Sequence, residues 1–299
     1  MRKPLVDHAA SVRARLLAYA KAKGLPFELV LTRYALERLL DRLARSPYQE
    51  RFVLKGGMLV TIWFDDPIRA TRDLDLLGFG DPVPDRVRAT FAEVMAMPAD
   101  DPLAFDAASL TVAPIRDADQ YGGIRLRTVA TLANARIPVV VDVAFGDAVE
   151  PGPQLIDYPV LLDDARPKIR AYAPETVIAE KFQAMVRLGR ANSRMKDFYD
   201  VWSLLRFHDL DRERLTLAIR ATFARRDTPL PDAPPDALTA AFATDAGKIR
   251  QWRAFVDDLT TEAPPLSTVV SDLAELLLPL VADARGEARP PQRRRVRDV

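Results

Sequence analysis

The sequence has no cysteine and only two histidines, His8 and His208. The lack of cysteine excludes disulfide bonds and thiolate metal sites, and it fits a reducing compartment without specifying one. Two histidines are also fewer than the ligand set of a metal-dependent phosphoesterase would need. That class of hydrolase is therefore disfavoured.

Long apolar runs are missing as well. The most apolar late run, residues 276–281, is short and contains Pro279, so we expect no membrane span. The first residues lack the apolar core of a signal peptide. We therefore expect a cytoplasmic protein.

No charge of one sign predominates, since 43 lysines and arginines stand against 42 acidic residues. There is thus no overall basic field, and any contact with RNA must come from a local patch. The 299 residues, of which 48% are hydrophobic, are enough for one large domain or two smaller ones.

Residues 52–78 carry the most informative pattern. A short apolar run ends at Lys55-Gly56-Gly57, a helix-like segment follows over residues 58–64, and after a turn at 65–67 comes an Asp73-Leu-Asp75-Leu strand. In a strand, side chains alternate between faces, so Asp73 and Asp75 point the same way while the leucines point into the core. Two neighbouring carboxylates repel each other unless a cation lies between them. The strand therefore predicts a platform for divalent metal ions.

The two glycines predict a phosphate site beside this platform. Without side chains, Gly56 and Gly57 let backbone N–H groups approach a phosphate at the start of a helix. Magnesium binds carboxylates together with substrate phosphates, so the combination indicates a nucleoside triphosphate site. Taken singly, a Gly-Gly pair is usually a turn and an Asp-x-Asp pair a solvated strand edge; together, at this spacing, they are a stronger signal.

Lys55-Gly56-Gly57 followed by Arg69-x-Thr71-x-Asp73-x-Asp75 resembles the signature of the AbiEii-type nucleotidyltransferases. These are toxins of bacterial toxin–antitoxin and phage-defence systems with the polymerase-β-like fold. The similarity covers roughly residues 28–207. It implies an α+β fold, in which N-terminal helices flank a small mixed sheet and a helical C-terminal lobe follows.

The expected organisation has four parts. They are N-terminal helices in 1–47, a nucleotidyltransferase core in 48–165, a helical lobe in 166–283 with a linker near 226–237, and a disordered arginine-rich tail in 284–299. The tail arginines could contact RNA by charge alone. The arginines of the second N-terminal helix are expected to form a solvated face, with RNA contact as the alternative; they are Arg33, Arg38, Arg42 and Arg45.

A third acid lies in a predicted hairpin with strands over 123–132 and 137–145, joined through 133–136. Asp142 stands within a run of β-branched residues, where an acid is costly unless it is paired or binds a metal. The resemblance makes Asp142 the third carboxylate of a metal triad. The alternative is an ion pair with Arg125 or Arg127.

Lys181 lies on a helix that we expect to begin at Pro174, and its helical neighbours are apolar. Such a lysine either extends to solvent or meets an anion, and we expect the anion to be the triphosphate. On this interpretation, Lys181→Met should not destabilise the nucleotide-free protein. The resemblance also matches Lys196 and Asp197 to a Lys-Asp element of the active site, whereas Asp200 fits ordinary helix electrostatics.

The resemblance implies magnesium-dependent transfer of a nucleoside monophosphate from an NTP, with two ions between the enzyme and the phosphates. The expected metal ligands are Asp73, Asp75 and Asp142, and these three with Lys181 and Asp197 form the expected catalytic set. The expected nucleotide-binding residues are Lys55, Gly56, Gly57, Arg69, Thr71, Lys181 and Lys196.

The resemblance further suggests an RNA acceptor, the 3′ end of tRNA, and a cognate antitoxin protein as partner. Relatives commonly have serine at the position of Thr71, so a role in which that side chain itself receives a phosphate or nucleotide does not carry over directly. The alternative function is a catalytically silent module that binds a nucleotide or a protein. Three converging acids argue against that alternative.

Overall fold

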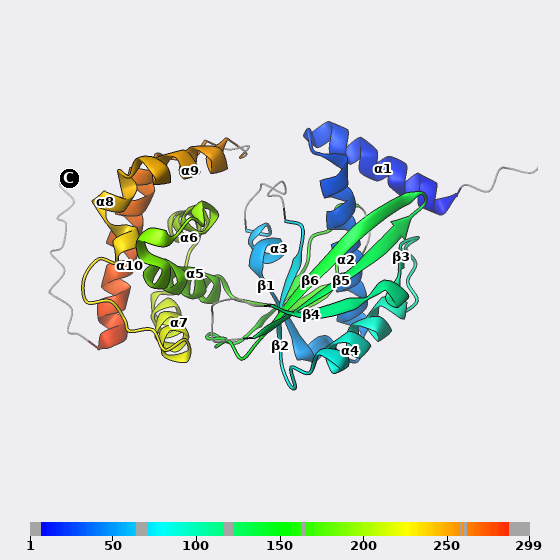
Figure 1. The fold of residues 1–299 in the computed structure, drawn as a ribbon, viewed down its shortest axis with the longest axis horizontal. Helices are drawn as coiled ribbons and strands as arrows, with labels where there is room; N and C mark the ends of the chain where they lie inside the picture. Colours follow the sequence, from blue (N-terminus) through cyan, green and yellow to red (C-terminus); the bar gives the residue numbers. More distant parts are fainter. Residues whose placement is uncertain are drawn as a thin grey trace, which may run out of the picture. The chain divides into compact units, whose positions relative to one another are not determined.

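The computed structural model describes residues 7–63, 71–115, 122–162, 165–257, 259 and 262–286. The chain divides into two compact units, which are described separately below (Figure 1). Unit 1 comprises Met1–Asp147 and Pro153–Tyr172, and unit 2 comprises Ala148–Gly152 and Ala173–Val299. The expected turn at 65–67, Arg69 and residues 287–299 of the tail lie outside the described residues.

Unit 1 is built on one mixed sheet. Its described strands are β1 (Phe52–Lys55), β2 (Leu74–Gly78), β3 (Ala104–Phe105), β4 (Thr111–Ile115), β5 (Gly123–Leu132), β6 (Ala135–Phe145), β7 (Gln154–Asp157) and β8 (Lys168–Ala171). The order is β3-β5-β6-β2-β1-β8-β7, with β4 paired to β5. β2 runs parallel to β6 and β1 parallel to β8, while β1 and β2 are antiparallel.

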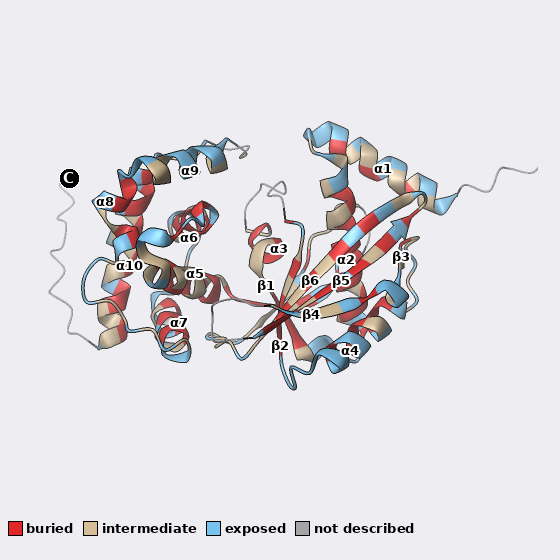
Figure 2. Ribbon diagram, viewed as in Figure 1, coloured by how far each residue is buried: buried red, intermediate tan, exposed pale blue. Residues whose placement is uncertain are grey.

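The sheet has one buried face. Along β6, Ile137, Val139, Val141 and Val143 are buried while the residues between them are more open (Figure 2). This alternation is the period of two expected of a strand with one face in the core. α2 (Phe27–Arg45) packs against β6 and β8, and α4 (Pro84–Ala96) packs against β4. Asp142 belongs to the other, more open set of positions.

One further long helix and three short helical segments complete the described part of unit 1. α1 (His8–Lys23) ends at Gly24, whose φ of 67° is the left-handed conformation that closes many helices. α3 (Gly56–Val60) follows β1 directly, and η1 (Gln49–Arg51) and η2 (Ala107–Ser109) are single turns. The predicted N-terminal helices and the strand–glycine–helix–strand order are thus present.

The arginines of α2 do not form a solvated face, and that prediction is wrong. Arg38 and Arg42 are only 4% and 3% exposed. Arg42 binds Asp101 through two hydrogen bonds of 2.8 and 3.1 Å, and Arg33 pairs with the buried Glu37 at 2.7 Å. Of the four, Arg45 has the exposed side chain, at 44%. Because buried charges need partners, most of this surface is unavailable to RNA.

Unit 2 is helical. Its helices are α5 (Pro174–Leu188), α6 (Met195–Phe207), α7 (Arg212–Arg225), α8 (Ala240–Ala243), α9 (Ala246–Val256) and α10 (Leu266–Arg285), with the short turns η3 (Gly189–Ala191) and η4 (Asp236–Leu238). Buried aromatic pairs join them, Phe182 with Phe223 and Phe198 with Phe242, at centroid distances of 5.3 and 5.2 Å. The expected single helix from 238 is divided between η4, α8 and α9.

The segment expected as a linker, 226–237, is attached to these helices. Arg226 forms an ion pair with Glu180 at 3.2 Å, and Arg285 donates to the carbonyl of Pro231 at 2.8 Å. It is therefore an ordered connection within unit 2. No described helix is long and apolar enough to cross a membrane. The predicted α+β class, a mixed sheet with helices at both ends of the chain, is confirmed.

Candidate active site

Three carboxylates meet on the open face of the unit 1 sheet. Asp73 precedes β2, Asp75 lies on β2, and Asp142 lies on the parallel neighbour β6, directly opposite Asp75. One oxygen from each carboxylate lies within 4.8 Å of the others. All three side chains are partly exposed. The structure therefore brings together the three residues that the sequence analysis predicted as metal ligands.

Cations border these acids on both sides. Lys55 on β1 is the cross-strand partner of Asp75, and Arg125 on β5 is the partner of Asp142. Across the adjacent strands β1, β2, β6 and β5 the order is thus Lys55, Asp75, Asp142, Arg125, which we call the charge row. Lys55 also bonds Asp147 at 2.7 Å, a contact that sequence reasoning did not identify.

Arg125 binds both oxygens of Asp142. Its Nε lies 2.7 Å from Oδ1 and its Nη2 lies 2.5 Å from Oδ2. The two interpretations of Asp142, as a member of an acidic triad and as the partner of an arginine, therefore both describe the structure. Of the two arginines considered, Arg125 is the partner, and Arg127 is exposed.

Asp75 has a raised pKa. Burial raises the pKa of Asp75 from 3.8 to about 6, with further raising by the charges of Asp73 and Asp142. The ammonium of Lys55 and a hydrogen bond from the Gly57 N–H lower the pKa and only partly offset these effects. A carboxylate that resists ionisation in this way gains most from a nearby cation.

The pH dependence of metal affinity follows from this pKa. Below pH 6 a metal must displace a proton from Asp75, so apparent Mn²⁺ affinity should fall by up to about tenfold per pH unit. Above pH 6 the carboxylate is already ionised, so affinity should level off. Calorimetric titration with Mn²⁺ between pH 5 and 7.5 would measure this. Constant affinity over that range would contradict the raised pKa of Asp75.

Asp75 and Thr71 lie so close to Gly56 and Gly57 that no side chain fits at either glycine. Gly56 has φ +67°, and a side-chain Cβ there would lie 1.9 Å from Asp75 Oδ2. A Cβ on Gly57 would lie 2.8 Å from Thr71 Oγ1. Only glycine allows the start of α3 to approach this closely. α3 has five residues, so any phosphate binding here would depend on individual N–H groups more than on a helix dipole.

Lys181 lies in unit 2 and pairs with carboxylates of α6. It contacts Asp197 directly and Asp200 Oδ2 at 3.0 Å. Asp197 is 6% exposed and Asp200 is fully buried, while Lys196 is exposed. Lys181 therefore meets two protein carboxylates within unit 2, and its expected contact with the triphosphate stays a prediction. Asp200, which was expected to fit ordinary helix electrostatics, is buried and pairs with Lys181 of the neighbouring helix α5.

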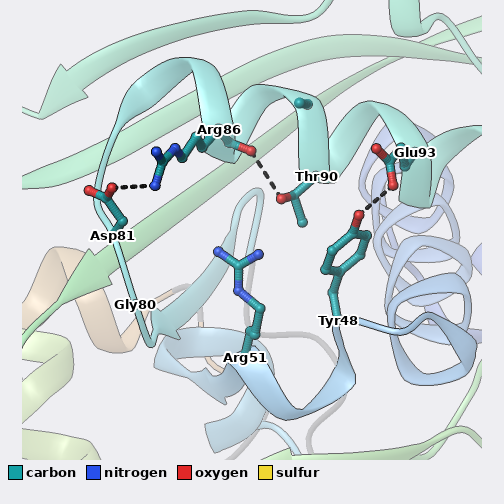
Figure 3. Close-up of a pocket in the computed structure, with 8 residues that line it drawn as sticks. Tyr48, Arg51, Gly80, Asp81, Arg86, Thr90 and Glu93 are labelled. Carbon is teal, nitrogen blue, oxygen red and sulfur yellow. Dashed lines mark hydrogen bonds and ion pairs between the residues drawn. The ribbon is translucent and has the colours of Figure 1, made fainter.

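A surface cleft of about 460 Å³ lies at the opposite end of β1 and β2 from the carboxylates (Figure 3). Arg86 pairs with Asp81 at 2.6 Å, and Tyr48 bonds Glu93. The lining residues are Tyr48, Arg51, Gly80, Asp81, Arg86, Ala89, Thr90 and Glu93. None of the predicted site residues that the structure describes lines this cleft, and no sequence pattern indicated it.

Comparison with known proteins decides the family. Residues 38–278 match the family described as "Nucleotidyl transferase AbiEii toxin, Type IV TA system". The chain belongs to the AbiEii family. It is thus a nucleotidyltransferase toxin of the type IV toxin–antitoxin class, which implies a nucleotide substrate and an antitoxin partner.

Two solved structures are similar to this AbiEii-family chain. One is a proposed nucleotidyltransferase from H. pylori (TM-score 0.49, 13% identity, 89% of this chain and 100% of that one). The other is JHP933 from Helicobacter pylori (TM-score 0.46, 13% identity, 84% and 90%). No protein in the curated set matches the chain. The assignment rests on the family match, because likenesses this distant carry no argument about the site.

Proposed function

We propose that this AbiEii-family protein transfers a nucleoside monophosphate from an NTP to an RNA hydroxyl, the 3′ end of tRNA, in a magnesium-dependent reaction. The observation that carries the proposal is the convergence of Asp73, Asp75 and Asp142 within 4.8 Å in a chain of this family. The acceptor hydroxyl loses its proton to water as its oxygen bonds to the α-phosphorus, the bond from that phosphorus to the bridging oxygen breaks, and pyrophosphate leaves.

The donor set fits magnesium. Its three ligands are carboxylates, which are the oxygen donors that this ion binds together with substrate phosphates. Burial, and then the charges of Asp73 and Asp142, raise the pKa of Asp75, so a divalent cation at these carboxylates would favour its ionised form. When bound, the metal ions would activate the acceptor hydroxyl and neutralise charge on the leaving pyrophosphate.

The other residues of unit 1 would orient the nucleotide. Lys55 stands beside Asp75 in the charge row and can attract phosphate oxygens. Gly56 keeps the backbone free of side chains next to Asp75, and the Thr71 hydroxyl lies against Gly57. We retain Arg69 as a nucleotide-binding residue by family resemblance; it lies outside the described residues.

We retain Lys181, Lys196 and Asp197 as active-site residues on the same ground. The ion pairs of Lys181 with Asp197 and Asp200 fix its ammonium at the border of α5 and α6. A lysine held in this way loses little conformational entropy when it meets a phosphate. Lys196 is exposed and free to follow a mobile ligand.

The direct test is incubation of purified protein with bulk RNA, Mg²⁺ and each α-labelled NTP in turn. We expect label in RNA of tRNA size, loss of labelling in EDTA, and none with the Asp75→Asn variant. Nucleotide binding without any transfer would instead indicate a catalytically silent module.

Expression in a bacterial host provides the cellular test. Growth should slow, and tRNA from the arrested cells should carry added nucleotides at its 3′ end. Co-expression of the cognate antitoxin should restore growth. Arrest with unmodified tRNA would show that the acceptor is a different molecule.

A further inference from the structure

Arg125 makes a two-point contact at the carboxylate cluster. Its guanidinium binds Asp142 at two points, at 2.7 and 2.5 Å. This is the fork geometry in which arginine binds carboxylates and phosphates equally well. The contact is built into the sheet, because Arg125 and Asp142 oppose each other directly in the β5–β6 hairpin.

The Arg125 side chain can leave Asp142 without disturbing the core. It is 35% exposed, whereas the side chain of Asp142 is 14% exposed. Its neighbours in the strand, Ile124 and Leu126, are buried and hold β5 on the opposite face. The guanidinium is therefore attached to a packed strand by a partly exposed stem.

The charges of the triad act on this guanidinium. The guanidinium binds Asp142 directly, and Asp142 offers an oxygen within 4.8 Å of oxygens of Asp73 and Asp75. A divalent cation bound by the same carboxylates would bring two positive charges to within a few ångströms of the guanidinium, where like charges repel. Arginine and metal thus compete for one set of acids.

We propose that Arg125 takes the place of the metal's charge in the metal-free protein, holding Asp142 in position and competing with the cation for it. Once the cation enters, the released guanidinium binds the phosphates of the nucleotide. This inference rests on the proposed function, since it takes Asp73, Asp75 and Asp142 as the metal ligands. It makes Arg125 a positioning residue before the nucleotide binds and a phosphate ligand afterwards.

Two binding measurements on Arg125→Gln test the proposal. Mn²⁺ titration without nucleotide should show affinity about tenfold tighter than wild type, which corresponds to about 1.4 kcal/mol. Inorganic triphosphate, titrated at saturating Mn²⁺, should bind about tenfold more weakly. If Arg125 had a purely structural role, the substitution would weaken the binding of both Mn²⁺ and triphosphate. Tighter Mn²⁺ binding together with weaker triphosphate binding therefore distinguishes the proposal from a structural role.

The matched control is Arg127→Gln, which removes the same charge two residues along β5. Arg127 is exposed and opposes Val140, not Asp142, so both affinities should stay within about twofold of wild type. Arg125→Lys, which keeps the charge but loses the two-point contact, should tighten Mn²⁺ binding less than Arg125→Gln. It also serves as the test variant if Arg125→Gln fails to fold in a thermal melt.

Unchanged or weaker Mn²⁺ binding by Arg125→Gln would overturn the competition between arginine and metal. Unchanged affinity for inorganic triphosphate would overturn the phosphate contact. If wild-type protein binds no Mn²⁺, the carboxylate site of the proposed function fails and this inference falls with it. That outcome is recognised in the wild type, before any arginine variant is compared.

Discussion

Asp75→Asn should lower nucleotide transfer by at least about a thousandfold, because the lost ligand removes several kcal/mol of transition-state stabilisation. Asp73→Asn should behave in the same way. A transfer assay with labelled NTP and RNA at saturating Mg²⁺ measures the loss. Turnover near the wild-type rate in either variant would exclude these residues as metal ligands.

The same substitution should stabilise the metal-free fold. Raising the pKa of Asp75 from 3.8 to about 6 means that its ionised form costs about 3 kcal/mol of folding free energy at pH 7. The cost is absent below pH 3.8, where the carboxyl is protonated in both folded and unfolded protein, and it grows as the pH rises to 6. Asp75→Asn should therefore melt above wild type at pH 7, and the difference should vanish below pH 4.

Lys181→Met should destabilise the protein by about 3–5 kcal/mol, because it leaves buried carboxylates without their cation. Asp197 is 6% exposed and Asp200 fully buried, and Lys181 pairs with both. This reverses the expectation from sequence, in which Lys181 met no protein anion. Denaturant unfolding without nucleotide measures the change.

Two variants control this experiment. Lys196→Met removes an exposed neighbouring charge and should change stability by less than about 0.5 kcal/mol. The double variant Lys181→Met with Asp200→Asn removes one of the buried charges and should recover part of the loss. Wild-type stability in Lys181→Met alone would mean that these ion pairs contribute nothing net to folding.

The carboxylate cluster could be predicted because its pattern is local. Alternation predicts that Asp73, just before β2, and Asp75, within it, face the same way, and Leu74 and Leu76 are buried as that alternation requires. Gly56 and Gly57 lie in the same short segment as these two acids, and all four residues belong to the motif that resembles the family signature. Asp142 was identifiable because an acid in a β-branched strand needs a partner.

The choice between Arg125 and Arg127 could not be made from the sequence, since it depends on the length of one turn. A connection over 133–136 would place Arg127 opposite Asp142. The hairpin instead turns at 133–134, with Leu132 paired to Ala135. Arg125 therefore opposes Asp142, because every cross-strand pair in a hairpin follows from its turn.

The arginines of α2 show a second limit of local patterns. A helical pattern places an arginine at the edge of an apolar face, but it does not show whether an acidic residue will pair with that arginine and bury it. Asp101, which binds Arg42, follows α4, and Glu37 lies between Arg33 and the backbone N–H of Leu161. The partner of Arg42 therefore comes from tertiary packing and is visible only in the folded chain, whereas Glu37 lies four residues after Arg33 on the same helix.

The position of β8 has a consequence for synthesis and for dissection of the chain. β8 is the parallel neighbour of β1, yet it is made after the segment Ala148–Gly152, which belongs to unit 2. During synthesis, the edge of β1 that pairs with β8 therefore stays unpaired until residue 172 has left the ribosome. A fragment ending at Asp147 would contain every carboxylate of the triad and still expose that edge, a template for aggregation. The shortest fragment of unit 1 with a closed β1 edge therefore extends to Tyr172, past the boundary at 165 that the sequence suggested.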